Sequence, residues 1–395
     1  MIVSGANNAT ATLSNVNGNA SDDDSSDDSK TVLVDPLTPA IGKLVIGEEA
    51  TGTWCGWCPR GAVGLINMDT KYHGLFQGIA VHNGDPMTDS VYDAGIGPYI
   101  SGYPSALVDR GPDIDPGAFE GDFLERIVIP PVAFITTGAT YDTINRILNV
   151  SITAEFQQCI SGNYKVACAI IEDSVTGTTS DYDQSNYYAG GGSGEMGGFE
   201  SLPNPVPASQ MQYDHVARSI SPSFEGLDNA YPDSTAVGYS HTHTFSFTLS
   251  PTWDENQIHI VGMLMDPAGR MDNAGSVTIT EAEATGLTNE GIVFVPGNVI
   301  SATITSTNPT DTNTCDGSAT VNTTGGSPPY NYLWSDASAQ TTAMATSLCT
   351  GTYTVDITDC LGATESMTVT LTAQTPTNTQ IFDGPDAIKL YPNPS

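Results

Sequence analysis

Two cysteines three positions apart are the residues of this sequence whose types and spacing most directly suggest chemistry. Cys55 and Cys58 follow the segment 43–49, whose apolar centre Leu-Val-Ile predicts a buried strand, and they precede a segment, 62–72, with apolar residues at roughly helical spacing. The positive end of such a helix would stabilise a thiolate on Cys55, and Cys58 would lie one turn on, close enough to attack a mixed disulfide. The pattern therefore indicates thiol–disulfide exchange.

The same spacing has two other interpretations that involve no redox turnover. A Cys-x-x-Cys pair can supply half of a zinc site, or it can close a static disulfide. A zinc knuckle needs a second pair at similar spacing, and neither Cys159 with Cys168 nor the three late cysteines supply one. Exchange and a static disulfide both stay open on the motif alone. Arg60 could lower the pKa of a nearby thiol, or it could simply point to water.

The charge of the chain excludes several classes of partner. Eleven lysines and arginines stand against 45 aspartates and glutamates among 395 residues, a net charge of −34. Such a chain cannot neutralise a run of phosphates, so nucleic acid is not expected as a partner, and binding to anionic lipid is disfavoured. No run of 18 apolar residues predicts a transmembrane segment. The composition fits a salty or extracellular medium.

The N-terminus and the cysteines bear on the compartment in which the protein works. The first residues lack the basic and apolar regions of a signal peptide, which predicts either a cytosolic protein or an exported one whose front end lies outside this sequence. Seven cysteines scattered over small β-rich modules favour an oxidising compartment. Residues 146–156 and 164–171 predict a hairpin around a turn at 161–163. Cys159 and Cys168 would not lie directly opposite there, so two buried thiols are favoured over a disulfide between them.

The pattern of predicted elements changes along the chain and indicates a multidomain protein. Residues 1–30 are interpreted as an acidic polar linker, with calcium binding the weaker alternative. Residues 31–130 alternate strands and helices, the α/β pattern. Residues 131–297 predict an antiparallel β-sandwich and 298–373 a small Ig-like sandwich. Residues 374–395 predict a linker and the start of a further segment.

Individual elements can be placed within these predicted domains. The long stretch 174–235, rich in Gly, Ser, Pro and Tyr, is expected to hold short strands or a lid over the sheet. The expected strands are 43–49, 78–82, 105–109, 242–249 and 257–265, and the expected helices are 62–72, 87–100 and 116–127.

The neighbourhood of the two cysteines resembles the thioredoxin superfamily. Trp54-Cys-Gly-Trp-Cys58 is similar to the family's Trp-Cys-Gly-x-Cys, and Gly102-Tyr-Pro-Ser-Ala-Leu-Val108 is similar to its cis-proline loop ahead of a strand. Glu49 stands where the family keeps a buried acid that handles protons for the buried cysteine; the alternative is a surface carboxylate at a strand end. The resemblance implies that Pro104 packs against the disulfide and that Tyr103 offers backbone groups to a substrate.

A longer match resembles the outer membrane protein 28-related family, in which a thioredoxin-like domain precedes a β-domain. The similar segments are 49–61, Asp214-His-Val-Ala-Arg218 and 265–274. The resemblance spans 31–297 and implies an exported, surface-associated protein. It indicates a location more than a reaction.

The C-terminal part resembles a SprB repeat, a β-sandwich unit of secreted and adhesive surface proteins of gliding bacteria. The similar segments are 315–321, 325–334 and 348–359. This resemblance implies a disulfide between Cys315 and Cys349, while Cys360 stands earlier in its turn than the pattern expects. Leu390-Tyr-Pro-Asn-Pro-Ser395 resembles the start of a type IX secretion sorting domain, which implies an incomplete reading frame of a longer exported protein.

Two histidines alternate on a predicted strand. His241 and His243 would lie on one face, and with His259 or His215 they could bind a metal. Histidines at this spacing are common on the polar faces of ordinary strands, and that interpretation is preferred, so no metal and no cofactor are expected. The sequence contains no nucleophile elbow, P-loop or dinucleotide fingerprint.

These features predict a multidomain chain with an α/β thioredoxin-like domain, an antiparallel β-sandwich and an Ig-like β-sandwich repeat. The predicted function is thiol–disulfide exchange on protein thiols or disulfides at the cell envelope or surface, after export by the type IX secretion machinery. The roles expected are attacking thiolate for Cys55, resolving thiol for Cys58, proton shuttle for Glu49 and substrate-side wall for Pro104, with Trp54, Trp57 and Tyr103 as substrate contacts.

The alternative is a non-enzymatic secreted surface or adhesion protein. In that case Cys55–Cys58 is a static disulfide, and glycan or protein ligands bind the β-domains. Aromatic-rich loops with Tyr182, Tyr187 and Tyr188 permit such partners without identifying any.

Overall fold

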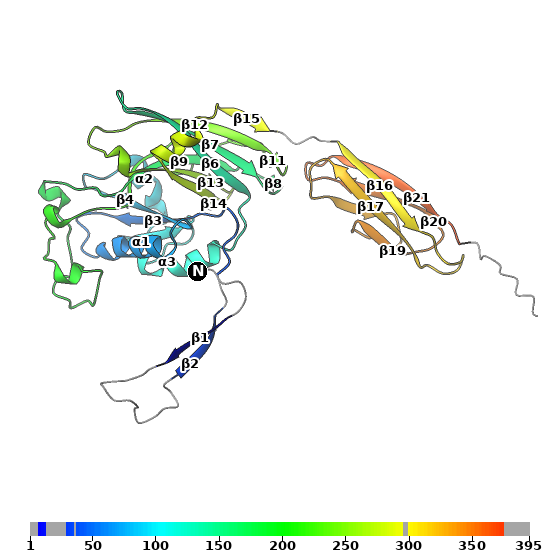
Figure 1. The fold of residues 1–395 in the computed structure, drawn as a ribbon, viewed down its shortest axis with the longest axis horizontal. Coiled ribbons are helices and arrows are strands. Elements are labelled where there is room, and N and C mark those ends of the chain that lie inside the picture. The colour runs from blue at the N-terminus through cyan, green and yellow to red at the C-terminus, as the bar shows by residue number, and fades with distance from the viewer. Residues whose placement is uncertain (1–6, 13–28, 35–36, 295–298, 375–395) are drawn as a thin grey trace, which may run out of the picture. The chain divides into compact units, whose positions relative to one another are not determined.

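A computed structural model describes residues 7–12, 29–34, 37–294 and 299–374 of the chain (Figure 1). The chain divides into two compact units, residues 1–295 and 296–395. No helix among the described residues is long and apolar enough to cross a membrane.

A seven-stranded sheet forms the centre of the first unit. Its order is β14-β13-β9-β10-β4-β3-β5; β3 and β4 run parallel, and β5 runs antiparallel to β3. The strands are Val45–Thr51 (β3), Phe76–His82 (β4), Ser105–Val108 (β5), Lys165–Glu172 (β9), Val216–Ser221 (β10), Ile258–Met265 (β13) and Met271–Thr278 (β14). Strands from both sides of residue 130 share this sheet, and the domain division expected there stays a prediction.

Helices cover both faces of the sheet around β3. α1 (Pro59–Lys71) and α3 (Phe119–Arg126) contribute to an apolar core on one face, and α2 (Ser90–Ile96) contributes to the core on the other. Every residue of β3 is buried, the two adjacent acids Glu48 and Glu49 included, as expected for a central strand covered on both faces. α2 is shorter than expected because it ends at Gly97 and Pro98, in a short turn.

A four-stranded antiparallel sheet packs against part of the first sheet. Its order is β15-β12-β7-β6, with β6 at Ala133–Asp142, β7 at Ile147–Phe156, β12 at Ser240–Thr248 and β15 at Gly291–Phe294. Side chains of β7 and β12 share one apolar core with those of β9 and β13. α4 (Ile279–Thr285) begins at a capping box formed by Thr278 and Glu281. The prediction of a β-rich chain with sandwich packing is confirmed.

The hairpin predicted between 146–156 and 164–171 is wrong. β7 pairs with β6 and β12, whereas β9 pairs with β10 and β13 in the other sheet. All but one residue of β9 is fully buried, as expected for a central strand covered on both faces. Short strands β8 (Ile160–Ser161) and β11 (Ser234–Thr235) pair with each other instead.

Because β7 and β9 form no hairpin, the prediction for Cys159 and Cys168 also changes. Cys168, in β9, is a free thiol, and burial raises its pKa. Cys159 is disulfide-bonded, so the prediction of a second buried thiol is wrong, because the hairpin on which it depended does not form. Cys360 is also disulfide-bonded.

The second unit contains two small antiparallel sheets. β16 (Ile300–Thr307), β17 (Gly317–Gly325) and β19 (Met344–Leu348) form one, and β18 (Asn331–Trp334), β20 (Gly351–Thr358) and β21 (Thr364–Leu371) form the other. Trp334 is buried in the core of this unit. A disulfide joins Cys315 to Cys349.

Near the N-terminus, β1 (Asn7–Thr12) pairs antiparallel with β2 (Ser29–Val34). Part of the segment interpreted as a linker is therefore strand. Its acidic run, 22–28, lies outside the described residues, as does the sequence 390–395 that resembles a sorting domain.

Candidate active site around Cys55 and Cys58

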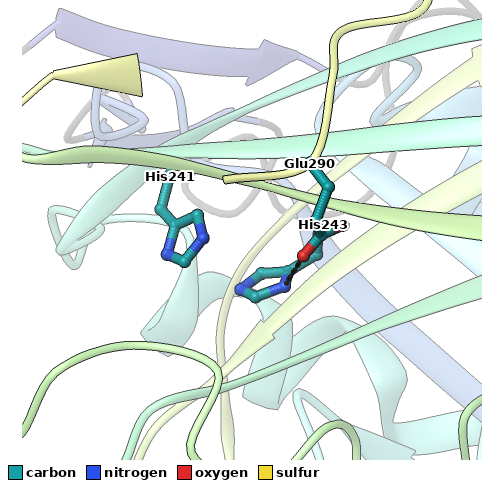
Figure 2. A group of neighbouring side chains, drawn as sticks. All are labelled: His241, His243 and Glu290. Carbon is teal, nitrogen blue, oxygen red and sulfur yellow. Dashed lines mark hydrogen bonds and ion pairs between the residues drawn. The ribbon is translucent and has the colours of Figure 1, made fainter. Parts of the chain in front are cut away.

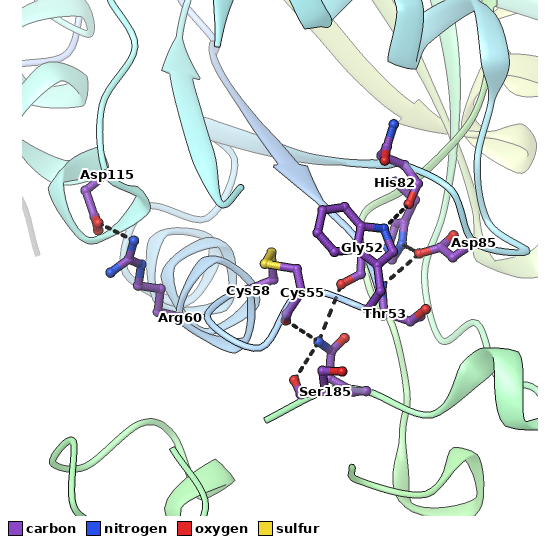
Figure 3. Close-up of a disulfide and its surroundings, with 12 residues drawn as sticks. Gly52, Thr53, Cys55, Cys58, Arg60, His82, Asp85, Asp115 and Ser185 are labelled. Atoms are coloured by element: carbon purple, nitrogen blue, oxygen red, sulfur yellow. Dashed lines mark hydrogen bonds and ion pairs between the residues drawn. A yellow bond between two sulfur atoms is a disulfide. The ribbon is translucent and has the colours of Figure 1, made fainter. Parts of the chain in front are cut away.

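Cys55 and Cys58 form a disulfide at the point where the chain passes from β3 into α1 (Figure 3). Their Cα atoms are 5.3 Å apart, and the residues are only 5% and 2% exposed. Cys58 is the N-cap of α1, Pro59 follows it in the first turn, and that turn contains no acidic residue. In the reduced state the helix end would therefore favour a thiolate, and no acidic residue of the first turn of α1 opposes this effect.

Glu49 lies on β3 on the α1 side of the sheet, and it is 1% exposed. Its Oε1 has no hydrogen-bond partner among the described residues. Burial raises the pKa of Glu49 to about 8, against smaller opposing effects of Thr51 and Arg60. A carboxyl group of this kind can accept or release a proton close to neutral pH.

A cavity of about 80 Å³ connects Glu49 with Cys58. Thr51, His82 and Tyr213 are among the other residues that line it. A cavity of this size has room for water, because a single water needs only about 10–15 Å³, and Glu49, Thr51 and His82 supply polar groups in its lining. A water molecule there could carry a proton between the Cys58 sulfur and the Glu49 carboxyl group.

Glycine at position 61 is what allows Glu49 to approach α1. A Cβ atom at Gly61 would lie 1.8 Å from Glu49 Oε1. Gly121, in α3, offers a matched comparison because a Cβ there would meet nothing within 4 Å.

We therefore expect Gly61→Ala and Gly121→Ala to change stability in opposite directions. Overpacking against Glu49 should lower the free energy of unfolding by about 1–3 kcal/mol, whereas alanine at an open helical position should raise it by up to about 1 kcal/mol. Urea unfolding with the disulfides intact measures both. A stabilised Gly61→Ala protein would show that Glu49 does not occupy this position.

The neighbouring acid, Glu48, lies on the opposite face of β3 and has a different environment. Arg110 contacts its carboxylate with Nη2 at 3.1 Å, and the Tyr92 hydroxyl donates a hydrogen bond at 2.7 Å. All three side chains are buried. Glu48 is thus neutralised by Arg110, whereas Glu49 has no ion-pair partner among the described residues.

The segment that resembles a cis-proline loop leads into the same end of the sheet. The Tyr103–Pro104 peptide bond is cis, and the next residue, Ser105, pairs with Ala50 of β3. The Tyr103 ring contacts the ring of Trp54 edge-on, with centroids 5.2 Å apart. Trp54 is about half exposed, so these aromatic rings offer an accessible apolar surface beside the disulfide.

Arg60 does not act on the sulfur atoms through an ion pair. Its guanidinium contacts the Asp115 carboxylate at 2.7 Å, and Figure 3 shows it directed away from the disulfide. Its positive charge still lowers the pKa of Glu49 slightly relative to burial alone.

Residues 180–188, named here the covering segment, lie against the loop that carries the cysteines. Backbone N–H groups of Ser185 and Tyr187 donate to the carbonyls of Thr53 and Gly56 at 2.7 and 2.8 Å. The buried Gln184 side chain donates from Nε2 to the Cys55 carbonyl at 3.0 Å. The stretch 174–235, expected to hold short strands or a lid over the sheet, contains the short strands β10 and β11, and its covering segment lies on the cysteine loop.

Aromatic side chains complete this cover. The ring of Trp57 lies between those of Tyr187 and Tyr188, with centroids 5.4 and 5.3 Å away. Sequence reasoning considered both tyrosines only as possible ligand contacts. Their sequence spacing from Trp57 carries no signal of this packing.

His82 and Asp85 form a second group that sequence reasoning missed. His82 Nδ1 lies 2.6 Å from Asp85 Oδ2, which also accepts the Thr53 N–H at 3.0 Å (Figure 3). Burial acts to raise the pKa of Asp85, but hydrogen bonds from His82 and from backbone N–H groups lower it overall. Asp85 therefore fixes the loop ahead of Cys55 as a carboxylate.

Comparison with known proteins supplies one family match and several solved structures. Residues 94–283, just under half of the chain, match the model of the family Outer membrane protein Omp28; the match begins after the two cysteines. HBP35 of Porphyromonas gingivalis is 17% identical with a TM-score of 0.47, over 85% of this chain and 100% of that one. A protein of Agrobacterium tumefaciens is 13% identical with a TM-score of 0.36, over 61% of this chain and 96% of that one. No curated protein sequence matches.

Proposed function

We propose that this protein is an exported thiol–disulfide oxidoreductase with a thioredoxin-like domain, acting on protein thiols or disulfides at the cell envelope or surface. The observation that carries the proposal is the shared cavity of Glu49 and Cys58, because it brings a buried acid with no ion-pair partner among the described residues to the resolving cysteine. The placement of Cys58 at the start of α1 and of Pro104 next to β5 supports it.

Reduction of a substrate would proceed in two displacement steps. The Cys55 thiolate attacks one sulfur of the substrate disulfide, a mixed disulfide forms, and the other substrate sulfur leaves as a thiolate. Glu49 then accepts the Cys58 proton through the cavity, and the Cys58 sulfur attacks Cys55. That step releases the second substrate thiolate and restores the Cys55–Cys58 disulfide. Oxidation of a substrate dithiol is the same sequence reversed.

The match of residues 94–283 to an outer membrane protein family supports a location at the cell envelope or surface. The net charge of −34 suits a salty or extracellular medium. We further propose that residues 298–373 are a SprB-type repeat and that the chain is exported by type IX secretion. The paired three-stranded sheets of the second unit are compatible with such a repeat.

The reduction potential of the Cys55–Cys58 pair tests the function first. We expect a value between about −120 and −270 mV with a Cys55 pKa below about 7.5, the range of exchange catalysts. Redox titration of the full chain gives the potential, and pH-dependent alkylation of the reduced protein gives the pKa. A potential below about −300 mV with an unreactive pair would favour the adhesion alternative, for which the near-complete burial of both sulfurs is the supporting observation.

Trapping separates the roles of the two cysteines. Cys58→Ser should accumulate a mixed disulfide with a reducible protein substrate, because the resolving thiol is gone. Cys55→Ser should not. Non-reducing electrophoresis followed by mass spectrometry of the bridged peptides detects the difference. Equal trapping by both variants would remove the assignment of Cys55 as the attacking residue.

A further inference from the structure

A second group of side chains that could bind a ligand lies on the four-stranded sheet. His241 and His243 are two residues apart on β12, and Glu290 directly precedes β15, the strand that pairs with β12 (Figure 2). One ligand atom from each of the three residues lies within 4.8 Å of the others. Two imidazole nitrogens and one carboxylate oxygen thus converge from two adjacent strands.

The hydrogen bonds of His243 leave one nitrogen directed at the carboxylate. Nε2 lies 2.8 Å from the backbone carbonyl oxygen of Ala230, to which it can only donate. Nδ1 lies 2.9 Å from Glu290 Oε1. In a neutral imidazole that donates from Nε2, Nδ1 carries a lone pair, which would face the negative oxygen. A cation bound by both Nδ1 and Glu290 Oε1 would satisfy the two atoms.

Hydrogen bonds orient His243 and Glu290 in the way that neighbouring groups usually orient metal ligands. A backbone carbonyl fixes the His243 ring, as it commonly does for metal-bound histidines. The backbone N–H and the hydroxyl of Thr244 both donate to Glu290 Oε2, so the other carboxylate oxygen is held toward His243. The Glu290 side chain is 52% exposed, which gives an ion and a water ligand access from solvent.

His241 and Tyr231 complete the surroundings. The His241 ring lies 4.4 Å from that of His243. Tyr231 is 4% exposed, stands edge-on to both rings at 6.0 and 5.3 Å, and has a hydroxyl without a hydrogen-bond partner among the described residues. This buried hydroxyl is an orphaned polar group beside the site.

We infer that His241, His243 and Glu290 bind one divalent transition-metal ion of the zinc type, with the fourth position left to water or an external ligand. Two nitrogens and one oxygen suit zinc and disfavour calcium or magnesium, which take mainly oxygen ligands. The site is independent of Cys55 and Cys58, and it would fasten the edge strand β15 to β12.

Zinc titration of the full, chelator-treated chain with its disulfides intact tests the inference. Calorimetry in 0.15 M NaCl with millimolar Mg²⁺ suppresses weak binding to exposed carboxylates. We expect one Zn²⁺ per chain, and a 10-fold or greater loss of affinity in Glu290→Gln and in His241→Gln. Both positions are at least partly exposed, and circular dichroism establishes that the variants fold.

Matched controls remove the same groups elsewhere. Glu283→Gln removes one exposed carboxylate from α4, and His73→Gln removes a histidine whose side chain is 88% exposed. Both should bind zinc like the unaltered chain. Co²⁺ should give visible absorption of a four-coordinate site that Zn²⁺ abolishes and that Glu290→Gln lacks. Absence of tight binding, or equal affinity in Glu290→Gln and Glu283→Gln, would overturn the inference.

Discussion

Glu49→Gln is expected to raise the free energy of unfolding at pH 8 by about 4 kcal/mol and to change it by less than about 1 kcal/mol at pH 5. Burial raises the pKa of Glu49 to about 8 from its ordinary value of 4.5. The folded protein therefore holds a proton that the unfolded chain releases above pH 4.5. With Glu49 in place, the free energy of unfolding is therefore highest below pH 4.5, and it falls as the pH rises toward 8. Glutamine does not ionise, so it avoids this loss.

Glu48→Gln is the matched control, because the two acids are neighbours on β3 with opposite environments. Glutamine at position 48 would leave the buried Arg110 guanidinium without its counter-charge. We expect a loss of about 3 kcal/mol that varies little between pH 5 and 8. Urea midpoints of the three proteins, measured at both pH values with the disulfides oxidised, give the comparison. The difference in free energy of unfolding between Glu49→Gln and the unaltered chain should be larger at pH 8 than at pH 5. An equal difference at both pH values would contradict the assignment of a buried protonated acid.

The same variant separates stability from chemistry. If Glu49 is the proton shuttle, Glu49→Gln should slow the resolving step by about 10²–10⁴-fold while it stabilises the fold. The rate of the unaltered protein should rise as the pH passes 8, where Glu49 becomes able to accept a proton, and that rise should be absent from the variant. Single-turnover kinetics with a small disulfide measure both. If the variant is stabilised but fully active, Glu49 is a buried protonated acid without a catalytic role.

The parts of the fold that could be predicted are those with a local sequence signal. Apolar runs predicted the strands at 43–49, 78–82 and 105–109, and the structure places β3, β4 and β5 there within a few residues. Such strands are covered on both faces, so their pattern needs no knowledge of the neighbours. The partners of a strand have no such signal. That is why β7 and β9, consecutive long strands, were predicted as a hairpin although they lie in different sheets.

The candidate site shows the same limit. Cys55, Cys58 and Glu49 could be proposed from their spacing and from a family resemblance, because side-chain types carry that information. The covering segment could not, because Ser185 and Tyr187 contact the cysteine loop through backbone groups that every residue has. The metal inference depends on Glu290, which is about fifty residues from the histidines and joins them only through the pairing of β15 with β12.

Release of the covering segment should speed reaction of the disulfide. Gln184 is 4% exposed, and its Nε2 donates to the carbonyls of Cys55 and Ser185 at 3.0 and 2.9 Å. Gln184→Ala would leave these carbonyl groups without that donor, at a cost of about 1–3 kcal/mol to the closed arrangement. Because both sulfurs are buried, attack by an external thiol requires this segment to open. The open population, and with it the reduction rate, should increase by about 10–100-fold.

The rate constant for reduction by dithiothreitol, followed by Trp fluorescence or by thiol labelling, measures this effect. Gln77→Ala is the matched control, because its Nε2 also donates to a backbone carbonyl, that of Gly78 at 2.8 Å, and Gln77 does not line the cavity of Glu49 and Cys58. It should react like the unaltered chain. Hydrogen exchange at Ser185 and Tyr187 should accelerate by the same factor as reduction in Gln184→Ala, since their N–H groups are held by the same contacts. Faster exchange with an unchanged reduction rate would mean that the thiol reaches Cys55 without opening of the covering segment. The exposed side beside Trp54 and Tyr103 would then be the path by which substrates approach.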